Sequence, residues 1–470
     1  MLLINRFTHW SEKRSILLIT IAFIISRILF YTAGISFYGN FLKRLWQSID
    51  FELLKTDLFQ SLYYSHAQPP LFNFLTGVVI KVSPEHYGFV FHVLFVGITW
   101  LTTLLLYITL RKLDLPSWLC LLVSFYYCIC PAVVLYENLP SYTSVVVLLI
   151  TISVFFFITF LQQGQSIYWL LFWISMLLLS MTRSSYHLVW LLALLLLMII
   201  FLKHKKVFSF KKVILALFPV LMVLMWYTKN FLLFGVFTAS SWMGMNMARI
   251  MPPETTLGDV GPFKSLTEYP DITPNQSYAH VMLLHEEVKQ KTGYINFYHI
   301  DYITVSEQFK KEVLTEIKNK PTLYFKRVMG AFKIYFCPST HGPFLDKNYR
   351  HIKTYASIIN ADFSGYQKFR KDFFPTHDAI PAVFIYVLLF SFMIYGFKRK
   401  IFNENDRALI FFLVFIVVSS MMISNILEYG ENNRFRFEMI TVILILLAKL
   451  SWAIVNDFRS RQHHSRTTNL

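Results

Sequence analysis

The sequence has few charged residues and few cysteines. Asp, Glu, Lys and Arg make up 15% of its 470 residues, whereas a soluble globular domain carries about 25%. No two of the four cysteines have the spacing of a disulfide framework or a zinc site. No two of His66, His187, His341 and His377 lie at metal-ligand spacing beside a carboxylate. A glycine-rich phosphate loop, a nucleotide-binding motif and internal repeats are also absent. We therefore expect neither a metal ion nor another cofactor.

Hydrophobic residues are abundant instead. They make up 55% of the chain, aromatic residues make up 18%, and phenylalanine alone occurs 47 times. A transmembrane helix needs about 20 mostly apolar residues, and ten stretches come near this length, although one contains Pro131 and another is short. The predicted spans are approximately 15–37, 87–110, 116–135, 141–162, 167–182, 186–202, 213–228, 381–397, 408–427 and 438–455.

The distribution of basic residues predicts how these spans are oriented. The net charge of +17 is concentrated in short loops and in the two tails, and with ten spans all of these segments fall on one side. By the positive-inside rule that side is cytoplasmic, which accounts for the charge without a nucleic-acid partner. We also expect an uncleaved first span, because no small-residue cleavage site follows it. The basic residues are Arg6, Lys13, Arg14, Arg111, Lys112, Lys203, Lys205, Lys206, Lys211, Lys212, Lys398, Arg399, Lys400, Arg407, Arg459, Arg461 and Arg466.

We expect an all-α polytopic membrane protein with about ten transmembrane helices, organised in three parts. Residues 1–228 form an N-terminal transmembrane module, which includes an acidic first external loop at 38–86. Residues 229–380 form a large external loop. Residues 381–470 supply the C-terminal transmembrane helices and a basic cytoplasmic tail. The two polar loops therefore lie on the same side of the membrane.

Both external loops should contain helices that do not cross the membrane. Residues 69–83 supply only about 15 apolar-rich positions before Pro84, too few for a span, so the first loop should form short interfacial helices. The large loop should be mostly helical, because residues 305–320 have helical periodicity and end before Pro321.

The first external loop carries candidate catalytic acids. Asp50 and Asp57 are seven residues apart, which places them on nearly one face of a helix, and a carboxylate at the membrane rim can act as a general base. His66 and Gln68 follow, just before Pro69 and Pro70. The alternative is an amphipathic connector whose acids only balance nearby Lys and Arg side chains.

The segment HAQPPLFN at residues 66–73 carries a resemblance to a known family. An acidic first external loop followed by a PPL motif resembles the GT-C glycosyltransferases, which include dolichyl-phosphate-mannose protein mannosyltransferases and bacterial aminoarabinose transferases. The resemblance covers the seven N-terminal spans and implies a polyprenyl-phosphate sugar donor. The family keeps its acid close behind the first span, but ISFYGNF here has none. The catalytic role therefore falls on Asp50 or Asp57, with Asp50 preferred because it lies nearer that span.

Arginines on the external side are candidate ligands for the donor phosphate. Guanidinium groups bind phosphate in a bidentate manner, and these arginines run against the positive-inside bias. The alternative is contact with lipid headgroups, and for each histidine a structural role is the alternative. Arg27, inside the first span, should pair internally. The predicted substrate-binding residues are His66, Gln68, Arg183, His187, Arg249, Arg434 and Arg436.

These observations favour a membrane glycosyltransferase, transferring a hexose or a pentose, with its active site on the external face of a bacterial inner membrane. Its partners would be a polyprenyl-phosphate-linked sugar, membrane lipids and an acceptor that the sequence does not identify. One alternative is an O-antigen polymerase or ligase, which would depend on Arg249 and His341 in the large loop. The other is a flippase or transporter for lipid-linked glycans.

Overall fold

The computed structural model describes residues 12–202, 209–270, 272–342, 344–359 and 380–467. Within these ranges the regular secondary structure is helical, apart from one isolated β-bridge between Val288 and Ile295. The predicted all-α class is therefore confirmed for the described chain. Four of the basic residues used to orient the spans lie outside the described residues, namely Arg6, Lys203, Lys205 and Lys206.

Each of the ten predicted spans coincides with a helix or a broken helix. Six helices are long and apolar enough to cross a membrane, and α8 with α9 adds a seventh if this pair, bent by 52°, is one span. The other three are shorter apolar helices. The described chain is thus a multi-pass membrane protein, while the count of about ten spans stays a prediction. The six are α2 (Glu12–Thr32), α7 (Tyr87–Lys112), α10 (Tyr142–Gln163), α13 (Phe210–Phe234), α23 (Glu404–Leu427) and α25 (Ile440–Thr467); the broken pair is α8 (Ser117–Ile129) and α9 (Pro131–Glu137), and the shorter ones are α11 (Ser166–Thr182), α12 (Leu188–Leu202) and α22 (Ile380–Lys398).

Local sequence explains where several of these helices end. Gly164 and Gly235 follow α10 and α13 with φ of 69° and 72°, the left-handed conformation that ends a helix at low cost only in glycine. The break between α8 and α9 falls at Cys130, which has an extended backbone. Pro131 imposes it, because a residue before proline avoids the helical region.

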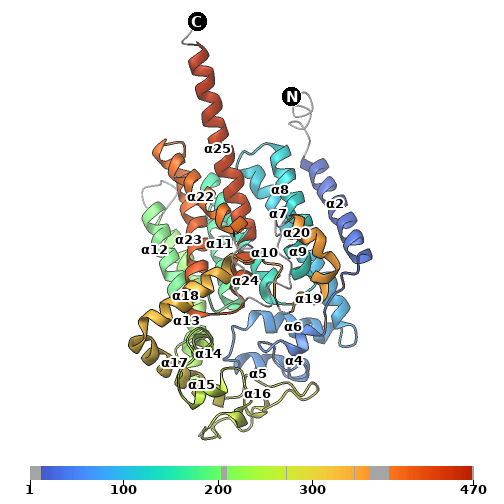
Figure 1. Ribbon diagram of the computed structural model, residues 1–470, viewed down its shortest axis with the longest axis vertical. Helices are drawn as coiled ribbons and strands as arrows, with labels where there is room; N and C mark the ends of the chain where they lie inside the picture. Colours follow the sequence, from blue (N-terminus) through green and yellow to red (C-terminus); the bar gives the residue numbers. More distant parts are fainter. Residues whose placement is uncertain (1–11, 203–208, 271, 343, 360–379, 468–470) are drawn as a thin grey trace.

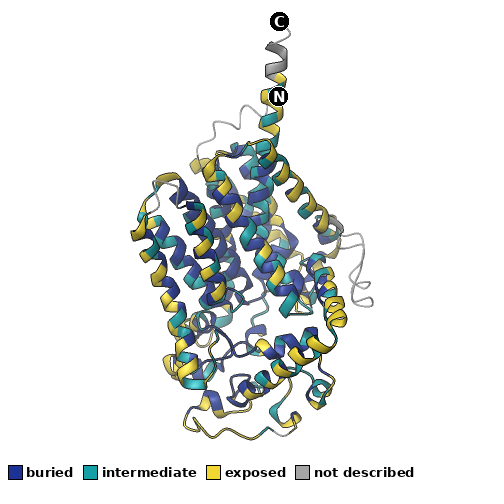
Figure 2. Ribbon diagram, turned by 90° about the vertical axis from the view of Figure 1, so that its left-hand side faces the viewer, coloured by how far each residue is buried: buried dark blue, intermediate teal, exposed yellow. Residues whose placement is uncertain are grey.

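The helices form a bundle with one central member. In α10, 72% of the most apolar window is buried, against 33% in α2. Figure 2 shows the same gradient, with buried residues in the middle of the bundle and exposed ones on its outer surface. The exposed positions of α2 include Leu17, Ile24 and Ile28, as expected of a surface in contact with lipid.

The two predicted external loops lie together at one end of the bundle (Figure 1), whereas the start of α2 and the end of α25 lie at the other end. A second hydrophobic core joins the two loops: Leu54 of the first loop (residues 38–86) packs in the same cluster as Trp242 and Tyr298 of the large loop (residues 229–380). The loops therefore fold as one layer over the end of the bundle.

The helices of the first loop are short, as predicted. The longest helix of the first loop, α6, has 12 residues and is therefore about 18 Å long, less than the ~30 Å needed to cross the hydrocarbon. The predicted helix at 305–320 coincides with the later part of α17, which ends one residue earlier, at Asn319. The elements are α3 (Phe41–Arg44), α4 (Phe51–Thr56), α5 (Leu58–Tyr63) and α6 (Leu71–Val82) in the first loop, α14 (Met243–Ile250), α15 (Thr256–Val260), η2 (Leu266–Glu268), α16 (Met282–His285), α17 (Asp301–Asn319), α18 (Pro321–Phe336), α19 (Asp346–Tyr349), η3 (Arg350–Ile352) and α20 (Lys353–Ile359) in the large loop, and α24 (Asn432–Glu438) between the last two long helices.

Candidate functional site

A cavity of about 320 Å³ lies where the bundle meets the loop layer. Its wall is built from the first loop, the start of α10, the segment between α11 and α12, the start of the large loop, and the end of α23. Three of the predicted substrate-binding residues line it: Gln68, Arg183 and His187. We call it the polar cavity, because serine, asparagine, glutamine and charged side chains contribute to its lining.

Arg183 is held at this cavity by the end of α11. That helix ends at Thr182, and Arg183 follows in an extended conformation. The side chain is buried and forms an ion pair with Glu438, which is also buried. The guanidinium carbon lies 3.9 Å from the ring centroid of Phe435. A buried cation needs such a partner, because desolvation of an unpaired charge is costly.

Arg434 and Arg249 meet at a shared carboxylate. Glu428, which lines the polar cavity, lies 3.4 Å from Arg249 Nη1 and 3.9 Å from Arg434 Nη2. Arg434 also pairs with Glu431 at 3.2 Å. The fold thus brings three predicted arginines, from α11, α14 and α24, into one cluster with three glutamates. Their formal charges cancel, so an incoming phosphate has to compete with a carboxylate for each guanidinium.

Arg436 points away from this cluster. Its Nη2 donates hydrogen bonds to the Cys337 carbonyl at 2.6 Å and to Ser339 Oγ at 3.3 Å. It lines a different, mostly apolar cavity of about 780 Å³ among α8, α22 and α25. Helix α24 separates the two cavities, since Phe435 lines the polar one and Arg436 the apolar one, as expected for neighbouring helix faces.

The two predicted catalytic acids do not line the polar cavity. Asp50 is buried at the start of α4, where Oδ1 accepts from the Glu52 N–H at 3.1 Å and Oδ2 from the Gln290 N–H at 2.6 Å. Asp57 is exposed at the start of α5. Asp50 therefore ties the first loop to the large loop, and its assignment as a base, like that of Asp57, stays a prediction.

His66 has the position of a structural residue. Its Nε2 lies 2.9 Å from the Tyr298 carbonyl and its Nδ1 lies 2.8 Å from Ser241 Oγ. A carbonyl can only accept, so Nε2 carries the proton and Nδ1 accepts from the hydroxyl. Complete burial lowers the pKa of His66 to about 3. The neutral ring links the first loop to the large loop, and it does not line the polar cavity.

Glu428 is the residue that sequence reasoning missed. Of the residues that line the polar cavity it is the one carboxylate. The segment ILEYGENNRFRFE, residues 426–438, holds three glutamates beside two arginines, and the sequence-based prediction of substrate-binding residues includes only the arginines. The need of a poorly solvated arginine for a counter-charge would have pointed to these glutamates.

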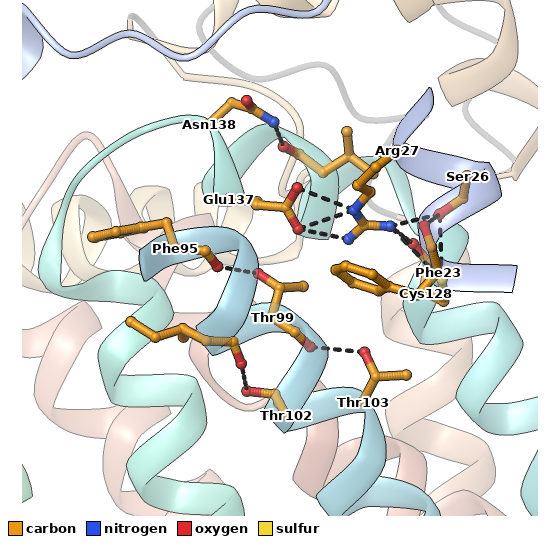
Figure 3. A network of polar contacts seen from close by, with 12 residues as sticks. Phe23, Ser26, Arg27, Phe95, Thr99, Thr102, Thr103, Cys128, Glu137 and Asn138 are labelled. Atoms are coloured by element: carbon orange, nitrogen blue, oxygen red, sulfur yellow. Dashed lines mark hydrogen bonds and ion pairs between the residues drawn. The ribbon is translucent and has the colours of Figure 1, made fainter. Parts of the chain in front are cut away.

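Arg27 pairs internally, as predicted (Figure 3), and it does not line the polar cavity. Its Nη2 lies 2.7 Å from Glu137 Oε2, and its Nη1 donates to the Cys128 carbonyl at 2.6 Å. That carbonyl belongs to the last turn of α8, where the helix offers it no partner. The arginine thus stabilises the break before Pro131.

Fold and site together define a helical multi-pass membrane protein with an arginine- and glutamate-lined cavity at one end of its bundle. No protein-family model and no curated protein matches the chain. A solved structure similar to it is the archaeal oligosaccharyltransferase AglB from Archaeoglobus fulgidus, in complex with an inhibitory peptide and a dolichol-phosphate. The two share 10% identity with a TM-score of 0.41, over 96% of this chain and 52% of that one. The chain thus spans about half the length of that protein, and the similarity is too low to support a functional argument.

Proposed function

We propose that this protein is a membrane glycosyltransferase that moves a sugar from a polyprenyl-phosphate carrier to an acceptor at the external face. The observation that carries the proposal is the polar cavity, in which Arg183 and Glu428 share one wall and Arg434 contacts Glu428. A donor phosphate and an acceptor hydroxyl need cations and a base close together, and this cavity offers both.

The arginines would stabilise the leaving group. Transfer breaks the bond between the anomeric carbon and the phosphate oxygen, and the electron pair leaves with the phosphate of the lipid. Fixed cations that face developing negative charge lower the barrier of such a step. Arg434 suits this role. Of its two carboxylate contacts, with Glu431 at 3.2 Å and with Glu428 at 3.9 Å, a phosphate can replace the longer one with a shorter bidentate contact.

Glu428 would receive the proton. The acceptor oxygen forms a new bond to the anomeric carbon and loses its proton to a base, which must lie within hydrogen-bond reach of it. Glu428 lines the cavity and its side chain is 14% exposed. Asp50 has both carboxylate oxygens engaged by backbone N–H groups, so Glu428 is our preferred base and Asp50 and Asp57 are the competing assignments.

One observation favours a second candidate function. Transporters commonly have broken helices and charged residues in mid-membrane, and the bent pair α8–α9 lies beside the buried pair Arg27 and Glu137. Both charges are fully satisfied within this network, however, and they lie away from the polar cavity. The polymerase-like alternative has less support, because His341 does not line that cavity.

Lipid binding tests the proposed function directly. Purified protein in nanodiscs is titrated with undecaprenyl phosphate and with undecaprenol, which differ only in the phosphate. We expect undecaprenyl phosphate to raise the melting temperature more, and Arg434→Gln to abolish that difference. Arg399→Gln is the matched control, because Arg399 is exposed just after α22. Equal stabilisation of the wild type by both lipids would refute a phosphate site.

A further inference from the structure

A second cavity lies beside the polar cavity, within the loop layer. It has a volume of about 340 Å³ and is lined by charged residues, including Arg44, Arg249, Lys289 and Glu431, and by aromatic residues of both loops. Trp46 lines both cavities. We call the second one the aromatic cavity.

Two of the aromatic rings that line this cavity, Trp46 and Phe263, pack on the buried ring of Trp242. The ring centroids of Trp46 and Trp242 are 3.9 Å apart with an angle of 16° between the rings, and those of Trp242 and Phe263 are 5.0 Å apart with an angle of 24°. Trp46 is only partly buried, so part of its surface faces the open space. The negative face of an aromatic ring suits the C–H bonds of a sugar ring stacked on it.

The charges of the aromatic cavity are unbalanced. Three cations face one carboxylate, Glu431, and that carboxylate already pairs with Arg434. Arg249 is neutralised by Glu428. Among the described residues, neither Arg44 nor Lys289 has a carboxylate within 4.0 Å. The cavity therefore offers two cations without an ion-pair partner in the part of the chain that the structure describes.

Lys289 is the more unusual of these two cations, because it is almost fully buried, at 3% exposure. Its Nζ donates to the Leu45 carbonyl at 3.1 Å. Burial lowers the pKa of its ammonium to about 8, against an opposing effect of Asp50, so the group is still charged at neutral pH. A buried cation of this kind is stabilised by an anion that enters the cavity.

We propose that the aromatic cavity binds the acceptor of the transfer reaction, and that this acceptor is an anionic sugar carrying a phosphate or a carboxylate. The sugar ring stacks on Trp46, and its anionic group contacts Arg44 and Lys289. The identification as an acceptor site rests on the proposed function. It follows from Trp46, which forms part of both cavities and so brings a bound sugar next to Glu428.

The test is direct binding of small sugars, measured by saturation-transfer NMR on the purified full chain. The probes are glucuronic acid and glucose 6-phosphate, with glucose as the neutral control. We expect the two anionic sugars, or one of them, to bind at least fivefold more tightly than glucose. The response to each probe tells which anion the site prefers.

Variants locate the binding site. Arg44 is exposed, so Arg44→Ala leaves the fold intact and should weaken binding about two- to fivefold. Trp46→Leu should weaken it about three- to tenfold through loss of the stacking surface. Lys318→Ala is the control, because Lys318 is an exposed cation of the large loop that does not line the cavity.

The outcomes separate this inference from the proposed function. Binding of glucose as tight as that of the anionic sugars, or anionic binding that Arg44→Ala and Trp46→Leu both leave unchanged, overturns the acceptor site. The response to undecaprenyl phosphate does not depend on Arg44. If the wild-type protein responds to the lipid phosphate but does not bind anionic sugars, the proposed function stands and the acceptor site is refuted.

Discussion

Arg249 and Glu428 form an ion pair, with 3.4 Å between Nη1 and Oε1, whose two members line different cavities: Arg249 the aromatic cavity and Glu428 the polar cavity. The pair is therefore part of the partition between them. This ion pair thus links the proposed donor site to the proposed acceptor site.

Glu428→Gln should lower sugar transfer by roughly 10²- to 10⁴-fold, the usual cost of removing a general base. The substitution keeps the size of the side chain and removes its basicity. Transfer is measured in nanodiscs at equal amounts of folded protein, beside Asp50→Asn and Asp57→Asn. If Glu428→Gln keeps full activity while Asp50→Asn or Asp57→Asn loses it, the general base is the first-loop acid and not Glu428.

Arg434→Lys should weaken donor binding by about tenfold or more, because lysine keeps the charge but lacks the bidentate fork. The affinity for undecaprenyl phosphate in nanodiscs measures this effect, and Arg399→Lys controls for general changes in basic charge. Unchanged affinity in Arg434→Lys would mean that Arg434 acts only as a partner of Glu428 and Glu431.

Arg27→Met should destabilise the bundle by roughly 3–5 kcal/mol, because it leaves the charge of Glu137 buried without a partner. The double variant Arg27→Met with Glu137→Leu removes both charges and should regain much of the loss. Thermal unfolding in detergent compares the three proteins. A double variant no more stable than the single one would show that the hydrogen bonds to Cys128 matter more than the charge.

Acid should destabilise the contact between the two loops through His66. Its folded pKa of about 3 lies below the unfolded value of 6.5, so the unfolded chain binds a proton that the folded chain excludes. The stabilisation is complete above pH 6.5 and declines as the pH falls from there toward 3. The loss by about pH 5 is roughly 2 kcal/mol.

Melting temperatures between pH 7.5 and pH 5 measure this dependence. The variant His66→Gln should show a shallower decline than the wild type, because glutamine does not titrate. His280→Gln serves as the control, since His280 is an exposed histidine of the large loop. Parallel curves for the wild type and His66→Gln would exclude His66 as the source of the acid sensitivity.

Cysteine labelling should report opposite sides for the two ends of the bundle. Single cysteines at Asp57 and Lys291, both exposed in the loop layer, should react with an impermeant reagent in intact cells. A cysteine at Arg399 should react only after permeabilisation. The four native cysteines are buried, so the background is low. Reaction at Arg399 in intact cells would invert the predicted orientation.

The sequence predicted what depends on local patterns. The apolar stretches coincide with helices, and α17 ends before Pro321 as its periodicity indicated. Arg27 has the internal partner that was predicted because an unpaired charge in a span is costly. The role of Asp50 could not be predicted, since its partner Gln290 is 240 residues away. A pattern in neighbouring residues cannot predict a contact over such a distance in sequence. The position of Glu428 between two arginines could not be predicted for the same reason.

The ion pair of Arg27 and Glu137 also bears on how the chain enters the membrane. An arginine costs up to about 2.5–3.5 kcal/mol in a single inserting helix, the value for the helix centre. Arg27 lies nearer the end of α2, so its cost is smaller, and its partner Glu137 follows 110 residues later. Until α9 has emerged from the ribosome, α2 carries an unneutralised charge. The first helix thus obtains its counter-charge only from a segment several helices downstream, and a nascent chain that stops short of Glu137 should hold α2 less firmly in the bilayer than the full chain does.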